Sequence, residues 1–112
     1  MGLLHHAQYL VYFEQGRVEL LRHRGLSYRD LEDQGYLMVL KSLEVHYRSP
    51  ARFDDDLALH TTVTRATGVR VEHAYRLTRG ADLLAEAKTT LVCVDRAGRV
   101  QRLHPTLIGA DY

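Results

Sequence analysis

The 112-residue sequence contains a single cysteine, Cys93, and no apolar run near the ~20 residues that a membrane-spanning helix needs. One thiol excludes an intramolecular disulfide framework and favours a reducing compartment. The first residues also lack the basic stretch followed by an apolar one that marks a secretory leader. We therefore expect a cytoplasmic protein that is neither exported nor inserted in a membrane.

Neither sign of charge is in excess. Lys and Arg total 15 against 14 Asp and Glu, and the apolar fraction is 46%. This balance gives no reason to expect nucleic acid or an anionic membrane surface as a partner. A chain of this length is expected to form a single domain, residues 1–112, around one core.

Residues 6–24 show the periodicity of a long amphipathic helix. Gly16 in its interior costs about 1 kcal/mol relative to alanine, which makes sense if another element packs closely there. Gly25 is positioned to end the helix. A second, short helix is predicted over residues 28–34, with Ser27 as its N-cap. The apolar residues that define the long helix are Leu10, Phe13, Leu20 and Leu21.

After the second helix the hydrophobic period changes from helical spacing to two, which is typical of strands with one buried face. The alternation runs through residues 37–48, 57–65, 69–77 and 83–95, and a tight turn at residues 80–82 joins the last two segments. This order predicts an α+β fold in which one long helix is wrapped by a curved antiparallel sheet. The side chains expected to face the helix are Leu37, Val39, Leu43, Val45, Tyr47, Leu57, Leu59, Val63, Val69, Val71, Tyr75, Leu77, Leu83, Ala85, Ala87, Leu91 and Cys93.

This order of elements, with GLLHHAQYLVYFEQGRVELLR at its head, resembles the hotdog-fold acyl-CoA thioesterases of the 4-hydroxybenzoyl-CoA thioesterase (YbgC-like) family. The family opens approximately Asp-x-x-Gly-x-x-Tyr-His-x-x-Tyr-x-x-x-x-Glu-x-x-Arg, and His5 stands where its tyrosine is usual. The resemblance continues through GLSYRDL, YRSPARFDDDL, LVCVD and RLHP, so it covers essentially the whole chain. The residues in register with the opening motif are Gly2, His6, Tyr9, Glu14 and Arg17.

The sequence departs from the family pattern at its start. The family's catalytic aspartate stands three residues before the motif glycine, which would place it two residues upstream of Met1. The family's first strand, which leads into that aspartate, is absent as well. We therefore expect the DNA upstream of Met1 to encode, in frame, a short strand that ends in aspartate and one further residue.

Thioester hydrolysis needs a nucleophile or an activated water, and a donor aimed at the carbonyl oxygen. The unpaired N–H groups at the start of a long helix provide such a donor. The resemblance implies that the backbone amide of His6 polarises the thioester carbonyl. From the residues alone, His5 and His6 are simply polar residues near a helix start. We expect no metal site, because adjacent histidines project apart and no further ligand stands at ligand spacing.

Glu14 and Arg17 are three residues apart on the long helix, so an intrahelical ion pair is the simplest expectation. The resemblance adds a second role, because some hotdog enzymes carry a catalytic glutamate on this helix. Glu14 is therefore the second catalytic candidate.

Two other reactive groups are interpreted as structural. Cys93 is expected to be a small buried hydrophobe rather than a nucleophile, because it stands on an inward face. The run Asp54–Asp56 is expected to begin a solvated loop rather than bind a divalent cation. Tyr47, Pro50 and Arg52 are expected to shape this loop.

The phosphates of coenzyme A should meet arginine side chains or backbone N–H groups. The resemblance places the nucleotide near the loop that enters the third long strand, which is residues 65–70 here. Arg65 and Arg70 are the candidates, although Arg70 stands where the family often has serine, and Arg102 is a third. For each of them the alternative is a solvated surface arginine. Coenzyme A is part of the substrate, so no separate cofactor is expected.

The sequence is thus interpreted as an acyl-CoA thioesterase that releases a carboxylic acid and free coenzyme A. The resemblance implies that two subunits pair sheet edge to sheet edge, with sites between subunits, and that dimers assemble further into tetramers. One alternative is a hotdog dehydratase or hydratase, which needs a histidine and a helix carboxylate facing one pocket across the dimer. Another is a non-catalytic acyl-CoA-binding protein. No single residue indicates the acyl-chain preference.

Overall fold

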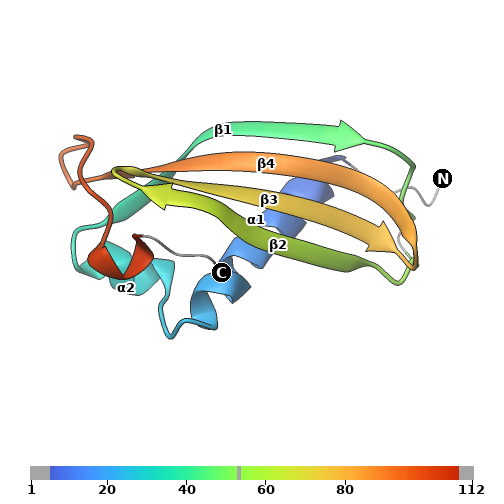
Figure 1. The fold of residues 1–112 in the computed structure, drawn as a ribbon, viewed down its shortest axis with the longest axis horizontal. Helices are drawn as coiled ribbons and strands as arrows, with labels where there is room; N and C mark the ends of the chain where they lie inside the picture. Colours follow the sequence, from blue (N-terminus) through green and yellow to red (C-terminus); the bar gives the residue numbers. More distant parts are fainter. Residues whose placement is uncertain (1–5, 53, 109–112) are drawn as a thin grey trace.

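The computed structural model describes residues 6–52 and 54–108 (Figure 1). Gly2 and His5, which belong to the opening motif, lie outside the described residues. The elements are, in order, α1 (His6–Arg22), α2 (Tyr28–Asp33), β1 (Leu37–Tyr47), β2 (Ala58–Thr67), β3 (Arg70–Arg79), β4 (Asp82–Val94) and the 3-10 turn η1 (Pro105–Leu107).

The four strands form one antiparallel sheet in the order β1-β4-β3-β2, and α1 lies along one face of this curved sheet (Figure 1). The predicted α+β architecture is therefore confirmed. No helix within residues 6–52 and 54–108 has both the length and the apolar character needed to cross a membrane.

The helix ends follow the predicted capping residues. At Gly25 the backbone takes φ 76°, and the Leu26 N–H donates to the Leu21 carbonyl at 3.2 Å, which ends α1 two residues earlier than predicted. Ser27 caps α2 as predicted, because its Oγ accepts a hydrogen bond from the Asp30 N–H at 3.0 Å. Short-range hydrogen bonds thus define where α1 ends and where α2 begins.

The core lies between α1 and the inner face of β3 and β4. Phe13 of α1 packs on Tyr75 of β3 with their ring centroids 4.8 Å apart. Burying an aromatic or leucine side chain of this kind contributes about 1.5–3 kcal/mol. The alternation predicted for the two central strands is confirmed over Val71, Tyr75, Leu77, Ala85, Ala87, Leu91 and Cys93, which are buried. It is wrong at the start of β4, where an irregularity in the pairing with β3 leaves Leu84 buried in place of the predicted Leu83.

The buried face predicted for the first strand is wrong in two respects. A β-bulge at Lys41 shifts the pairing with β4, so that Met38 and Leu40, not Leu37 and Val39, stand opposite the inward residues of β4. In addition, β1 is an edge strand that α1 does not cover. Its apolar side chains consequently remain accessible, including Val39 (47%), Leu40 (47%), Leu43 (37%) and Tyr47 (52%).

The predicted inward stripe of α1 also needs one correction. Leu10 is 41% exposed, whereas Tyr9 is buried and takes its place against the sheet. The buried residues Tyr9 and Phe13 are one turn apart, so Leu10 points to the side of the helix, as do the exposed Val11 and Val18.

The expected close approach at Gly16 is confirmed. A Cβ atom at this position would overlap the Thr61 hydroxyl of β2 and would lie 2.9 Å from Leu59 Cδ2. The helix therefore touches β2 where it has no side chain.

We expect Gly16→Ala to lower the free energy of unfolding by about 1–3 kcal/mol, because overlap with Thr61 outweighs the gain in helix propensity. Chemical denaturation measures this difference. Gln15→Ala, at the exposed neighbouring position, should change stability by less than about 0.5 kcal/mol. Adding Thr61→Ala to Gly16→Ala should restore most of the loss, and a purely additive double variant would contradict the close contact.

Candidate functional site

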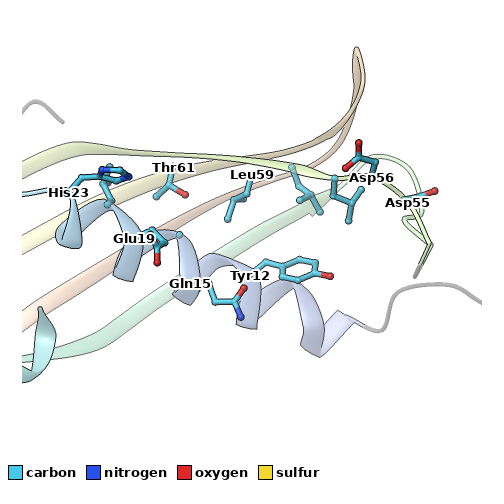
Figure 2. Close-up of a pocket in the computed structure, with 12 residues that line it drawn as sticks. Tyr12, Gln15, Glu19, His23, Asp55, Asp56, Leu59 and Thr61 are labelled. Atoms are coloured by element: carbon cyan, nitrogen blue, oxygen red, sulfur yellow. The ribbon is translucent and has the colours of Figure 1, made fainter.

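Helix α1 leaves a groove on each of its two sides. The first, which we call the β2-side groove, has a volume of about 610 Å³ and lies between α1, β2 and the loop that precedes β2 (Figure 2). The second, the β1-side groove, has a volume of about 390 Å³ and is lined by Glu14, Arg17, Val18, Tyr28, Glu32, Leu37, Met38, Val39, Leu40 and Leu91. All candidate catalytic groups on the helix must act in one of these grooves or at the helix start.

The β2-side groove runs along the open edge of β2. Figure 2 shows Tyr12, Gln15, Glu19 and His23 of α1 on one wall, Leu59 and Thr61 on the other, and Asp55 and Asp56 at one end. Glu19 forms an ion pair with Arg22 at 3.3 Å, and no ion pair joins it to His23 within the described part of the chain. Glu19 and His23 therefore line the same groove without an ion pair between them.

Asp55 organises the loop that follows β1. Its carboxylate accepts hydrogen bonds from the Arg52 N–H at 2.8 Å and from Arg79 Nη1 at 2.9 Å. The bond from the Arg52 amide, helped by Arg79 and opposed by partial desolvation, lowers the pKa of Asp55. The predicted solvated loop therefore holds for Asp54 and Asp56, which are exposed, whereas Asp55 is held by Arg52 and Arg79. Tyr47, also predicted to shape the loop, packs edge-on against Tyr9 at 5.0 Å.

His6 is the first residue of α1 and is exposed. The first turn of α1 contains no acidic residue. The partial positive charge of the helix start is thus not offset there by a side chain of the helix itself. The Tyr9–Tyr47 contact places this end of the helix beside the last residues of β1.

Glu14 is exposed and lines the β1-side groove. The predicted Glu14–Arg17 ion pair is wrong: Arg17 instead turns toward the sheet, where its Nη1 donates to Tyr75 Oη at 2.9 Å. The buried phenol needs a partner, and Arg17 lies on the helix flank nearest to it. Along the helix axis Glu14 lies about 12 Å from His6, so a single chain does not bring these two candidates together.

Sequence reasoning missed a polar cluster beneath Arg17. Tyr75 Oη is 2.6 Å from Thr89 Oγ1, and burial raises the pKa of Tyr75. The buried His73 stacks on Tyr75, and its Nδ1 has no hydrogen-bond partner within residues 6–52 and 54–108. Burial, together with the charge of Arg17, lowers the pKa of His73 to about 4. The alternation of the strand could have revealed the buried histidine, because His73 occupies one of its inward positions.

The three arginines predicted to bind coenzyme A gather at one end of the sheet. Arg65 and Arg70 flank the β2–β3 turn, and Arg65 Nε donates to Thr67 Oγ1 at 3.2 Å. The Leu103 N–H donates to the Gly68 carbonyl at 3.0 Å, which brings Arg102 beside the same turn. All three side chains are exposed, and the start of α1 lies toward the other end of the sheet (Figure 1).

Cys93 is fully buried on β4, and burial raises the pKa of its thiol. A thiol held in its protonated form and out of contact with solvent is a poor nucleophile. The prediction of a small buried hydrophobe is confirmed.

Comparison with known proteins identifies relatives of one kind. The model of the thioesterase-like superfamily matches residues 1–108. The chain is 33% identical to the acyl-CoA thioester hydrolase YbgC of Escherichia coli over 112 residues, 99% of this chain and 84% of the relative.

Solved structures agree. A hypothetical protein from Thermus thermophilus superposes with a TM-score of 0.87 at 32% identity, covering 96% of this chain and 82% of the other. A DHNA-CoA thioesterase from Staphylococcus aureus gives 0.86 at 26% identity, with 92% and 70% coverage. Together with the order of helix and strands, these matches show that the chain belongs to the thioesterase-like superfamily and has the hotdog fold of the YbgC-like proteins.

Proposed function

We propose that this protein hydrolyses an acyl-CoA thioester to a carboxylic acid and free coenzyme A, in the cytoplasm and without a separate cofactor. The observation that carries the proposal is the similarity to an acyl-CoA thioester hydrolase along 99% of the chain. The start of α1, whose first turn contains no acidic residue, and the groove beside the helix support the proposal as places for the reacting carbonyl and for an acyl group.

The active form is a dimer formed by β1, with further assembly of dimers into tetramers. Within the described sheet, β1 pairs on one side only, and an unpaired edge is a template for another strand. The exposed apolar side chains concentrate on this strand and on the neighbouring side of α1. Pairing two copies of β1 antiparallel would bury them, and such a two-fold contact is the commonest way in which subunits associate. These residues are Leu10, Val11, Val18, Val39, Leu40, Leu43 and Tyr47.

The direction of β1 determines which parts of the two copies meet. In an antiparallel pair, the Leu37 end of one strand lies beside the Tyr47 end of the other. Tyr47 contacts Tyr9 near the helix start. The His6 amide of one copy therefore comes toward the β1-side groove, and hence toward Glu14, of the second copy. This arrangement joins two candidates that a single chain keeps apart.

In the proposed reaction the His6 N–H donates to the thioester carbonyl oxygen as it gains negative charge. Glu14 of the second copy accepts a proton from a water molecule whose oxygen attacks the carbonyl carbon. The C–S bond then breaks, and the proton held by Glu14 passes to the departing thiolate. The products are a carboxylic acid and coenzyme A, and Glu14 is again a carboxylate.

We expect His6→Pro, which deletes the amide donor at a position where helices tolerate proline, to lower kcat for acyl-CoA hydrolysis by about 100-fold or more. His6→Ala, which keeps the amide, should have a much smaller effect. Glu14→Gln should also lower kcat by about 100-fold, because it removes a general base. Release of the coenzyme A thiol, followed with a thiol reagent, measures all three.

The exposed Glu19 on the same helix provides the matched control, and Glu19→Gln should leave kcat unchanged. Mixing the inactive His6→Pro and Glu14→Gln proteins tests whether the site forms between copies. Random exchange makes half of the dimers mixed, each with one intact site, so about a quarter of the activity should return. Binding without turnover in the unsubstituted protein would instead favour the non-catalytic acyl-CoA-binding alternative.

The nucleotide of coenzyme A is proposed to lie at the β2–β3 turn. Arg65, Arg70 and Arg102 all lie beside this turn, and no ion pair within residues 6–52 and 54–108 neutralises them. Guanidinium groups bind phosphate oxygens with paired N–H donors.

Changing each of these arginines to alanine should raise KM for an acyl-CoA by about tenfold and leave kcat nearly unchanged, because the contact lies away from the reacting carbonyl. The same acyl group on N-acetylcysteamine, which has no phosphates, should be hydrolysed equally by the parent and the variants. An equal loss with both thioesters would contradict this assignment.

Leu43 lies near the middle of β1, where two copies of the strand approach each other in the proposed dimer. Leu43→Lys should therefore place like charges together and shift the protein to a monomer, as measured by sedimentation or light scattering. Val100→Lys, at an exposed site outside β1, should keep the parent mass. A parent protein that is already monomeric at micromolar concentration would refute the dimer.

A further inference from the structure

The β1-side groove contains a positive charge without a counter-ion. The guanidinium of Arg17 is half-buried between α1 and the sheet, and its Nη1 donates to Tyr75 Oη. Within residues 6–52 and 54–108, no ion pair joins Arg17 to a carboxylate. Glu14 and Glu32 line the same groove but do not pair with it. Partly buried cations are normally paired, so the fold leaves room for an anion here.

Contacts beneath Arg17 hold its guanidinium in place. Tyr75 accepts its hydrogen bond, and Thr89 contacts the phenol oxygen at 2.6 Å. His73 lies next to Tyr75 and is neutral at physiological pH, because its pKa is about 4. Arg17 is therefore the single cation among the described residues that line the groove. A guanidinium held by one of its five N–H donors keeps the others for a ligand.

The rest of the groove suits an apolar chain. Val18 from the helix and Met38, Leu40 and Leu91 from the sheet form its walls. Its volume of about 390 Å³ falls within the range of small-molecule pockets, which are mostly apolar with a few fixed polar groups. These apolar walls and the oriented guanidinium, with which neither Glu14 nor Glu32 of the groove pairs, are complementary to an apolar chain that ends in a carboxylate.

We propose that the β1-side groove binds the acyl group of the substrate and that Arg17 pairs with a carboxylate at the far end of that group. The substrate class is then an acyl-CoA of a dicarboxylic acid. The inference rests on the proposed thioesterase function and names its substrate class. Antiparallel pairing of β1 turns the groove of one copy toward the helix start of the other, so the acyl group enters it from the reacting carbonyl.

The test compares matched thioesters that differ only at the far end: hexanoyl-CoA with adipoyl-CoA, octanoyl-CoA with suberoyl-CoA, and decanoyl-CoA with sebacoyl-CoA. Kd is measured by calorimetry in the Glu14→Gln background, in which the thioester is not consumed, and kcat and KM are measured by thiol release with Glu14 present. At one length or more, the parent protein should bind the carboxylate member at least about tenfold more tightly than the methyl member, because a charge-assisted pair forms. A purely apolar pocket would prefer the methyl member.

Arg17→Gln should abolish this preference and leave the Kd of the methyl member within about twofold. Arg17→Lys should retain part of it, because the charge remains and the paired geometry is lost. Arg22→Gln removes a charge from the exposed face of the same helix and should change neither Kd. If Arg17→Gln weakens both members equally, Arg17 has a structural role only and the inference is overturned.

The result separates this inference from the proposed function. Hydrolysis without a carboxylate preference at any length overturns the inference and leaves the thioesterase function intact. A preference that depends on Arg17 in Kd, without turnover, supports the inference and refutes the hydrolysis. Absence of detectable binding for all six thioesters overturns both.

Discussion

The packing of α1 against the concave face of the sheet is the constraint on which the rest of the structure depends. At Gly16, which has no side chain, the helix lies against the side chains of Thr61 and Leu59 of β2, and at Phe13 it packs on the buried ring of Tyr75. A helix held this closely cannot shift along the sheet without overlap. The start of α1 is therefore held beside the end of β1. The close packing also fixes the widths of the two grooves beside the helix.

The two grooves beside α1 differ in the residues that line them. On the β2 side, the groove is bordered by Glu19, His23 and the loop of Asp55, whose carboxylate is already bound to Arg52 and Arg79. On the β1 side, apolar walls surround a guanidinium anchored by Tyr75. Strand β1 takes part in both proposals. Its unpaired edge is the proposed dimer contact, and its side chains help to form the groove in which the acyl group is proposed to bind.

Much of the fold was predictable because its signals are local. The helix ends follow from Gly25 and Ser27, whose backbone and side-chain hydrogen bonds are short-range. The inward residues of β3 and β4 follow from alternation on central strands, except at the start of β4, where Leu84 is buried in place of Leu83. The bulge at Lys41 could not be predicted, because it arises from pairing with β4 and exchanges the two faces of half a strand. The candidate site was predicted as a list of separate residues. The polar cluster of His73 and Tyr75 beneath Arg17 was not recognised.

The sequence by itself determined which segments become helix and strand, that α1 opens at His6, and that Arg65 and Arg70 lie at the β2–β3 turn, because periodicity, caps and turns act over a few residues. Only the tertiary structure decided that Arg17 bonds Tyr75 rather than Glu14, that β1 keeps its apolar side chains exposed, and that Arg102 lies beside the β2–β3 turn. The physical reason is that a side chain's partner depends on what the packed helix and sheet bring within hydrogen-bond distance, which no local pattern records.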